Sequence, residues 1–197
     1  MKILTLILVC IFLLSQRVHG QGTFVYDQQS ATESTGGGGT VVIQANQPLG
    51  QSFTPTLTSI GFIRLFVGDT TLNGLGATLV VNVRANSITG AILGTSDAVA
   101  MPDGFFGYPN FFFPTPVAVT PNDTYFFQPV LQSGDSTWAV VAYNAYNYSG
   151  GMGYANGLAN PTIDLWFREG IIVPEPGAVA LVLVGGGMLI WFRRKFP

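Results

Sequence analysis

The sequence contains one cysteine, one histidine and, between residues 21 and 194, no lysine. The cysteine and the histidine, Cys10 and His19, both lie within the first 20 residues. A chain that begins at residue 21 therefore has no disulfide, no thiolate nucleophile, no histidine-based catalytic triad and no cysteine or histidine ligand for zinc. Carboxylate chemistry is the catalytic option that these absences leave open.

Charge is scarce as well, at 9% of all residues. Nine acidic residues and three arginines give residues 21–173 a net charge of −6. The acidic residues are Asp27, Glu33, Asp69, Asp97, Asp103, Asp123, Asp135, Asp164 and Glu169, and the arginines are Arg64, Arg84 and Arg168. An acidic surface with so few cations cannot neutralise many phosphates, so we expect no nucleic-acid partner.

Residues 1–20 have the pattern of a secretory signal peptide. Lys2 supplies the positive start, the run from Ile3 to Leu14 is apolar, and Val18-x-Gly20 is a small-residue cleavage pattern just before Gln21. The alternative is an N-terminal membrane anchor, but an apolar run of 12 residues is too short to span a bilayer. We therefore expect cleavage between Gly20 and Gln21 and export of the chain.

The other end of the chain predicts a membrane helix at residues 178–192. These 15 apolar or glycine residues would extend about 22 Å as a helix, short of the ~30 Å hydrocarbon core. Trp191 at the interface and local thinning of the bilayer would help to close the gap. The basic cluster Arg193-Arg194-Lys195 argues against a buried core helix and should stay cytoplasmic, which leaves residues 21–173 outside the inner membrane.

Residues 173–197 resemble a known sorting signal. Pro174, Glu175 and Pro176, then the short apolar run and then the basic cluster at the extreme C-terminus are similar to the PEP-CTERM signal of exported proteins in Gram-negative bacteria that make extracellular polysaccharide. The resemblance implies that an exosortase-type membrane protease recognises Pro174, Glu175 and Pro176 and cleaves nearby. The inner-membrane anchor would then be transient, and the protein would pass to the cell surface or the extracellular matrix.

Residues 21–172 read as one all-β domain. In residues 78–84, Leu79, Val81 and Val83 alternate with Asn82 and Arg84, as in a half-buried strand. Further strands are predicted at residues 59–67, 124–131, 137–143 and 163–168. Turn signals separate them at Asn73-Gly74, Thr89-Gly90, Pro102-Asp103-Gly104, Pro121-Asn122-Asp123 and Ser133-Gly134-Asp135. Many short strands at this spacing indicate a β-sandwich or barrel.

Two strands carry more detailed expectations. Pro129 lacks an N–H group, so the strand at residues 124–131 should lie at a sheet edge or end early. In residues 163–168, we expect Ile163, Leu165 and Phe167 on one face and Asp164, Trp166 and Arg168 on the other.

A second resemblance concerns residues 50–170. Gly50-Gln51-Ser52-Phe53-Thr54-Pro55, the strand-like SIGFIRLFV and LVVNVR, and the TGAILGTS stretch at residues 89–96 are similar to a module of secreted bacterial proteins of the choice-of-anchor type. Such modules resemble galactose-binding-like jelly rolls. Because these motifs mark turns and core positions, the resemblance supports a jelly-roll β-sandwich rather than a particular ligand.

The candidate ligand-binding residues are four tyrosines in the stretch 142–157. Tyr143, Tyr146, Tyr148 and Tyr154 lie among asparagines and glycines, and aromatic faces stack on sugars while asparagine both donates and accepts hydrogen bonds. The alternative is a glycine-rich surface loop whose tyrosines pack on their own sandwich.

Other aromatic and glycine-rich stretches leave two readings each. Trp138 and Trp166 are expected in the core or at an edge. Residues 104–116 are either an exposed apolar patch or a strand pair that buries Phe112 and its neighbours. Residues 36–39, four glycines, are either a flexible loop or a linker that joins an N-terminal strand to the sandwich.

No cofactor is expected, with a structural Ca²⁺ ion as the alternative. Six acidic residues lie in or near turns, where carboxylates can collect around calcium, but EF-hand spacing is absent. They are Asp27, Glu33, Asp69, Asp103, Asp123 and Asp135.

Two functions from different classes remain. The favoured one is a non-enzymatic surface or matrix protein with a structural or adhesive role, in contact with exopolysaccharide. The alternative is a carbohydrate-active hydrolase or lyase that uses two carboxylates, which must face each other about 5–10 Å apart. Nothing in the sequence pairs any two of the acidic residues.

Overall fold

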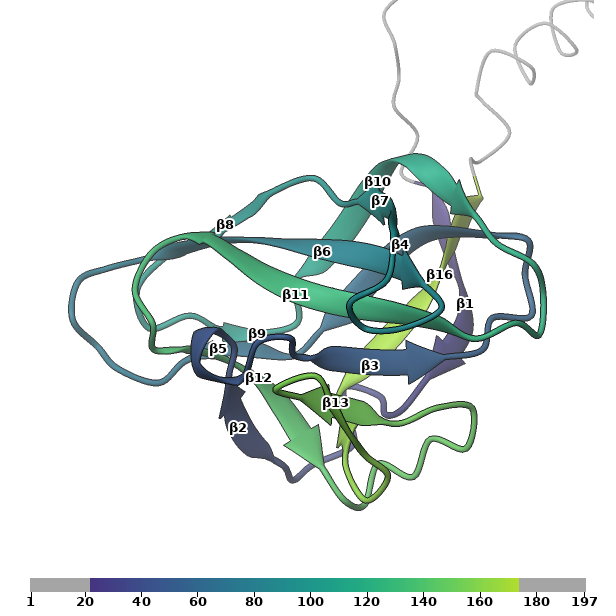
Figure 1. Cartoon of the computed structure of the whole chain (residues 1–197). Helices are drawn as coiled ribbons and strands as arrows, with labels where there is room; N and C mark the ends of the chain where they lie inside the picture. The colour runs from purple at the N-terminus through teal and green to yellow at the C-terminus, as the bar shows by residue number, and fades with distance from the viewer. Residues whose placement is uncertain (1–21, 174–197) are drawn as a thin grey trace, which may run out of the picture. The chain divides into compact units, whose positions relative to one another are not determined.

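The computed structural model describes residues 22–173, of which Val25–Ile171 form one compact unit (Figure 1). The other described residues, 22–24 and 172–173, belong to a separate unit. The predicted signal peptide, the Gly20–Gln21 cleavage site and the sorting segment from Pro174 onward lie outside the described residues. Within residues 22–173, no helix combines the length and the apolar character needed to cross a membrane.

The described chain is all-β with antiparallel sheets, as the sequence predicts. A four-stranded sheet has the order β1 (Thr23–Gln29), β16 (Phe167–Val173), β4 (Ser59–Leu65) and β10 (Asn110–Ala118). A seven-stranded sheet has the order β14 (Leu158–Asn160), β13 (Gly153–Ala155), β3 (Gly50–Phe53), β11 (Tyr125–Ser133), β6 (Ala77–Ala85) and β7 (Ile92–Thr95), with β8 (Val99–Met101) also paired to β6. Figure 1 shows β6 and β11 side by side across the middle of the view.

A five-stranded sheet completes the described domain. It has the order β15 (Asp164–Leu165), β12 (Trp138–Tyr143), β5 (Val67–Asp69) and β9 (Phe106–Gly107), with β2 (Gly39–Val42) paired to the other edge of β12. A short 3₁₀ helix, Gln44–Asn46, follows β2. Of the four glycines at residues 36–39, the first three therefore lie in the connection between β1 and β2, and Gly39 is the first residue of β2.

One hydrophobic core joins the sheets in a sandwich-like arrangement. Leu79, Val81 and Val83 point inward from β6 and are fully buried, which confirms that they share one face. The strand is not half-buried, however, because Val80 and Asn82 are buried as well, at 5% and 8% exposure. Rings from different sheets meet in this core, since Phe127 of β11 lies 5.1 Å from Phe167 of β16 between ring centroids. Such aromatic contacts contribute beyond the burial of area alone.

The strand that contains Pro129 is neither an edge strand nor cut short, so that prediction is wrong. Pro129 lies in the long central strand β11, opposite Val81 of β6. On its other side, β3 pairs with β11 only as far as Phe127, and the carbonyl of Pro129 accepts a hydrogen bond from the Gln47 side chain at 2.9 Å. The carbonyl and the nitrogen of a strand residue face the same side, so the nitrogen of Pro129 faces the side of β3. Because the β3 ladder has already ended there, the missing N–H group costs no strand hydrogen bond.

Two predicted strands are each divided at an aromatic residue. The segment 59–67 is split at Phe66 into β4 and β5, and the segment 163–168 is split at Trp166 into β15 and β16. In both cases the chain passes between the four-stranded and the five-stranded sheet. Ile163, Leu165 and Phe167 all contact the main core, as expected for one face, and Trp166 belongs to a different cluster. The second face is not exposed, however, because Asp164 and Trp166 are buried as well, at 8% and 0% exposure.

The other local expectations are confirmed for the two tryptophans, and each alternative for residues 104–116 holds only in part. Trp138 and Trp166 are both fully buried. Strand β10 buries Phe111 and Phe113, whereas Phe112, which faces the other side, is 36% exposed. Within the predicted turns, the residues with a left-handed backbone are Gly74 (φ 82°), Gly104 (φ 70°), Asn122 (φ 68°) and Gly134 (φ 112°).

Replacement of Leu79 by alanine should lower the free energy of unfolding by about 2–5 kcal/mol, because the side chain is fully buried on β6 and leaves a cavity. Urea denaturation of the full-length chain in mild detergent measures this change. Leu75→Ala is the matched control, since Leu75 is 54% exposed and its loss should change stability by less than about 0.5 kcal/mol. Equal effects of the two substitutions would contradict the assigned core.

Candidate functional site

The four candidate tyrosines do not form one cluster. Tyr146 is buried, and its hydroxyl donates a hydrogen bond to the carbonyl of Gly37 at 2.8 Å. Tyr154 packs edge-on against Phe126, with ring centroids 5.5 Å apart. These two tyrosines therefore pack on their own sandwich, as the alternative interpretation of the loop expects.

Tyr148 attaches the loop to the main core. Its ring meets Phe167 edge-on at 5.1 Å, and its hydroxyl accepts a hydrogen bond from the Thr54 backbone N–H at 3.1 Å and donates one to the Gln28 side chain at 3.0 Å. Burial raises the pKa of Tyr148 to about 12. Its phenol is therefore a neutral structural group at physiological pH.

Tyr143 differs from the other three because it is 38% exposed and lines an open groove of about 380 Å³. The groove lies where β2, the end of β12 and the residues before β15 come together. Its lining residues are Gly39, Thr40, Val41, Ala142, Tyr143, Asn144, Thr162 and Ile163. One exposed aromatic ring, three polar side chains and several apolar groups therefore share one hollow, which we call the Tyr143 groove.

The Tyr143 groove has a fixed aromatic wall. The ring of Tyr143 meets that of Tyr146 edge-on, with centroids 5.5 Å apart, and Tyr146 is itself held by Gly37. Gly37 has φ of 92°, and a Cβ atom there would lie 2.8 Å from the Tyr143 ring. A side chain at residue 37 would therefore clash with the ring, which gives one of the four glycines a definite packing role.

The connection between β1 and β2 lies over a second, smaller aromatic cluster. We call residues 30–38 the strap. Beneath it, Tyr108 and Phe66 lie 4.4 Å apart and Tyr108 and Trp166 also lie 4.4 Å apart, measured between ring centroids. The indole N–H of Trp166 donates to the carbonyl of Thr32 at 3.3 Å, so the strap is fastened directly to the cluster.

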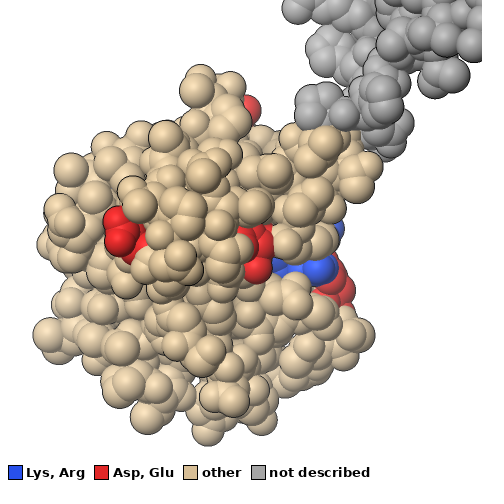
Figure 2. All heavy atoms as spheres, turned by 90° about the vertical axis from the view of Figure 1, so that its right-hand side faces the viewer, with Lys and Arg blue, Asp and Glu red and all other residues tan. Residues whose placement is uncertain are grey.

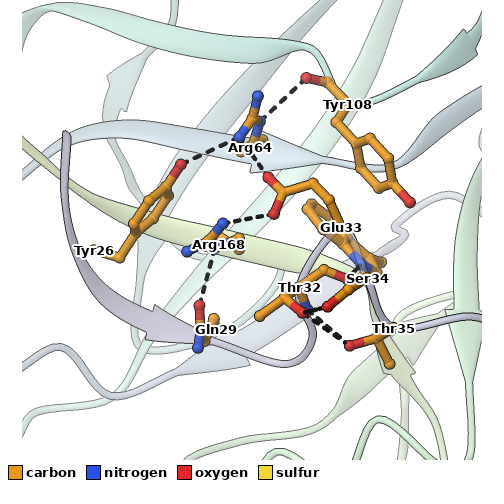
Figure 3. A network of polar contacts seen from close by, with 10 residues as sticks. Tyr26, Gln29, Thr32, Glu33, Ser34, Thr35, Arg64, Tyr108 and Arg168 are labelled. Atoms are coloured by element: carbon orange, nitrogen blue, oxygen red, sulfur yellow. Dashed lines mark hydrogen bonds and ion pairs between the residues drawn. The ribbon is translucent and has the colours of Figure 1, made fainter.

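A charged bridge also fastens the strap, as Figure 3 shows. The two carboxylate oxygens of Glu33 bind Arg64 at 2.5 Å and Arg168 at 2.7 Å. These arginines belong to β4 and β16 and lie directly opposite each other in the register. Two like charges in such a position repel, and the Glu33 carboxylate offsets that repulsion.

Figure 2 shows how few charges the surface carries on one side of the domain. Most of that face is uncharged, and the basic side chains visible on it lie beside acidic ones. This agrees with the low charge content of the sequence, 9% of all residues.

A pair of carboxyl groups lies at the junction of β1 and β16. Glu169 is fully buried, and neither of its carboxyl oxygens makes a hydrogen bond of normal geometry. Burial, followed by the nearby Asp27 carboxylate, raises the pKa of Glu169 to about 9. Glu169 is therefore neutral at pH 7, and the net charge of the domain is −5 rather than the −6 that a simple count gives.

Asp27 is the charged member of this pair. Partial burial would raise the pKa of Asp27, but hydrogen bonds from the Thr56 hydroxyl and from the N–H groups of Leu57 and Thr56 lower it overall. The two N–H groups donate to the same carboxylate oxygen, Thr56 at 2.7 Å and Leu57 at 3.0 Å. Asp27 thus holds the turn before β4, and its role is structural.

The turn acids also hold loops. Asp69 accepts hydrogen bonds from the N–H groups of Thr71 and Gly104, at 3.0 and 3.1 Å, and Asp135 accepts one from the N–H group of Thr137 at 3.0 Å. In the described part of the chain, no three acidic, histidine or cysteine side chains gather where they could hold a metal ion. The structural Ca²⁺ ion stays a prediction.

Sequence reasoning missed the buried polar side chains that hold the tyrosine loop. Gln51 of β3 donates to Asp164 at 2.7 Å, and the other carboxylate oxygen of Asp164 accepts the N–H of Tyr148 at 2.8 Å. No signal in the sequence marks Gln51 as buried. Glu169 could have been recognised, because it shares its strand face with Phe167, which was expected to be buried.

No protein-family model matches the chain, and no curated protein matches it at a significant level. Any function must therefore be argued from the residues and their arrangement.

Glu169 should make the domain less stable as pH rises. Its folded-state pKa is about 9 against an ordinary value of 4.5, so the folded state holds a proton that the unfolded state has released between these values. The free energy of unfolding should fall by up to about 1.4 kcal/mol per pH unit in this window. Urea denaturation at pH 5, 7 and 9 measures the slope.

Glu169→Gln keeps the shape of the side chain and removes its titration, so the slope should flatten and stability at pH 9 should rise. Asp123→Asn, at an exposed turn residue, is the control and should keep the slope. A wild-type chain equally stable at pH 5 and pH 9 would show that Glu169 does not hold a proton in the folded state.

Proposed function

We propose that this chain is an exported, non-catalytic surface or matrix protein of a Gram-negative bacterium whose ectodomain, a jelly roll of the galactose-binding-like kind, contacts exopolysaccharide. An exosortase-type protease recognises Pro174, Glu175 and Pro176, and the inner membrane holds the protein only until it is processed. The observation that carries the ligand part of this proposal is the Tyr143 groove.

The composition of the Tyr143 groove suits a neutral sugar. The exposed ring of Tyr143 offers a face for the C–H surface of a pyranose, and Asn144 can both donate to and accept from hydroxyl groups. Thr40 and Thr162 add two hydroxyl groups among the lining residues. A ring with an apolar face and a polar rim needs this combination, in which stacking supplies affinity and hydrogen bonds supply orientation.

The arrangement of the carboxylates favours binding over catalysis. Glycoside hydrolysis needs two carboxyl groups about 5–10 Å apart on either side of the scissile bond. The lining residues of the Tyr143 groove include no acid. Among the described residues, Asp27 lies close to Glu169, which is buried, and Asp69 lies close to Asp135. Asp69 and Asp135 both accept a hydrogen bond from the Thr137 hydroxyl and both hold loop N–H groups, so their oxygens are already engaged in structural contacts. The alternative, a hydrolase or lyase with a carboxylate pair, therefore has less support.

The sorting part of the proposal rests on the resemblance of residues 173–197. Strand β16 ends at Val173, the residue immediately before the Pro-Glu-Pro motif. Cleavage beyond Val173 would therefore leave every strand of the described domain intact. This position is compatible with release of a folded ectodomain.

Tyr143→Ala should weaken retention of the protein by exopolysaccharide about 3- to 10-fold, which corresponds to the loss of one aromatic contact. The measurement is affinity electrophoresis of the full-length chain in gels that contain the exopolysaccharide of its own cells. Phe112→Ala is the matched control, because Phe112 is 36% exposed but lies on β10, outside the groove. If both variants migrate like the wild type, the groove does not bind the polysaccharide.

Simultaneous replacement of Pro174, Glu175 and Pro176 by alanine should leave the protein in the inner membrane, because the protease loses its recognition motif. Cell fractionation with immunoblotting measures the distribution. The sequence contains a second Pro-x-Pro, Pro114-Thr115-Pro116 on β10, and its replacement by alanines is the control for general effects of proline loss. Normal release of the Pro-Glu-Pro variant would count against the sorting proposal.

A further inference from the structure

The pair formed by Arg64 and Arg168 is unusual for this domain. The described residues contain three arginines and no lysine, yet two of the three arginines face each other across neighbouring strands. Like charges in directly opposite strand positions destabilise a sheet. The pairing of β4 with β16 does not require an arginine in each of the two opposite positions. The presence of both arginines therefore needs a separate explanation.

Both guanidinium groups are held in place without Glu33. Arg64 donates to the Tyr26 hydroxyl at 3.2 Å and to the carbonyl of Tyr108 at 3.3 Å. Arg168 donates to the Gln29 side chain at 2.9 Å, and its guanidinium carbon lies 3.4 Å from the centroid of the Tyr26 ring. Figure 3 shows these contacts on both sides of the Glu33 carboxylate. The geometry of the pair is therefore set in advance for a carboxylate between its members.

Glu33, in contrast, is carried by the strap. Its side chain is 35% exposed, compared with 26% for Arg64 and 15% for Arg168. The strap continues after Glu33 with Gly36, Gly37 and Gly38, and nothing lies within 4 Å of a Cβ position at Gly36. The glycines allow this backbone to change conformation, and lifting of the strap breaks its hydrogen bonds from Trp166 to Thr32 and from Tyr146 to Gly37 while the arginines stay in place.

Aromatic rings adjoin the arginine pair. Tyr108, whose carbonyl binds Arg64, lies 4.4 Å from Phe66, and Phe66 lies 4.6 Å from Phe106, which is 60% exposed. The strap covers part of this cluster, so a carboxylate that arrives on a sugar ring would find aromatic surface beside the cations once the strap has moved. A glutamate or aspartate side chain of a peptide would carry no ring to place there.

We propose that Arg64, Arg168 and Tyr26 form a receptor site for the carboxylate of an acidic sugar, and that Glu33 occupies this site as an internal ligand until a uronate displaces it. The site is separate from the Tyr143 groove and would take a different ligand, an acidic rather than a neutral polysaccharide. Binding of a polyuronate exchanges one carboxylate for another, so the arginines keep a counter-charge throughout.

The test uses the full-length chain in mild detergent with polygalacturonate as the probe. Glu33→Gln removes the competing charge and should bind polygalacturonate at least 10-fold more tightly than the wild type does. The gain should disappear when Arg168→Gln or Arg64→Gln is added to Glu33→Gln. Arg84→Gln is the matched control, because Arg84 lies on β6 and binds Gln128 and Gly90, and it should leave the gain unchanged.

Further probes separate the alternatives. Dextran, a neutral polymer, should show no gain, and added salt should weaken the binding of polygalacturonate because the contact is ionic. The gain should persist when Tyr143→Ala is added, which separates this site from the Tyr143 groove. The single variant Tyr143→Ala tests binding at the Tyr143 groove alone. The proposal for the groove and the proposal for the arginine pair can therefore be rejected independently.

Two results would overturn the inference. The first is a Glu33→Gln variant that keeps the wild-type melting temperature but binds polygalacturonate no more tightly. The second is equal binding of polyglutamate and polygalacturonate, which would make the ligand an acidic peptide. Hydrogen exchange tests the same idea on the wild type, without any substitution. Polygalacturonate should speed amide exchange in residues 31–38. Unchanged exchange in these residues would contradict displacement of Glu33.

Discussion

Two backbone hydrogen bonds at Val141 hold the corner on which both candidate sites depend. The N–H of Val141 donates to the carbonyl of Phe66 at 2.9 Å, and its carbonyl accepts the N–H of Trp166 at 2.8 Å. Phe66 and Trp166 are the points at which the chain passes between the four-stranded and the five-stranded sheet. Central strand β12 thus fixes both crossings with a single residue.

The positions of the functional groups follow from this corner. Arg64 lies two residues before Phe66 and Arg168 two residues after Trp166, so the crossings bring the two arginines opposite each other. Tyr143 lies two residues after Val141, at the end of the same strand β12. The strap covers the aromatic side chains of the corner and carries Glu33 to the arginines.

Much of the fold could be predicted from the sequence because local patterns determine it. The alternation around Val81 and the turn residues specify strands and their buried faces without reference to distant residues. The crossings could not be predicted, because a strand that changes sheets at Phe66 has the same apolar, β-branched sequence as one that continues. Pro129 is tolerated in the central strand β11 because the neighbouring strand β3 ends before it. The sequence around Pro129 carries no information on where β3 ends.

The candidate site was predicted only in part, for the same reason. The stretch 142–157 contains Tyr143, but exposure separates this tyrosine from Tyr146, and exposure depends on the strap that packs beside it. The arginine pair is invisible in the sequence, since Arg64 and Arg168 are more than 100 residues apart and meet only through strand pairing. Composition did indicate the class of chemistry, because a domain almost without charge has little to offer besides aromatic rings, hydroxyls and amides.

The intact mass and the cellular fraction of the native protein test the central claim, that this domain is exported and released, most directly. The account predicts a mature form that begins at Gln21, ends near residues 174–176 and is found outside the inner membrane. A form in the inner membrane that retains Arg193, Arg194 and Lys195 would contradict it. Such a protein would be a plain single-span membrane protein, and the role in the extracellular matrix would lose its main support.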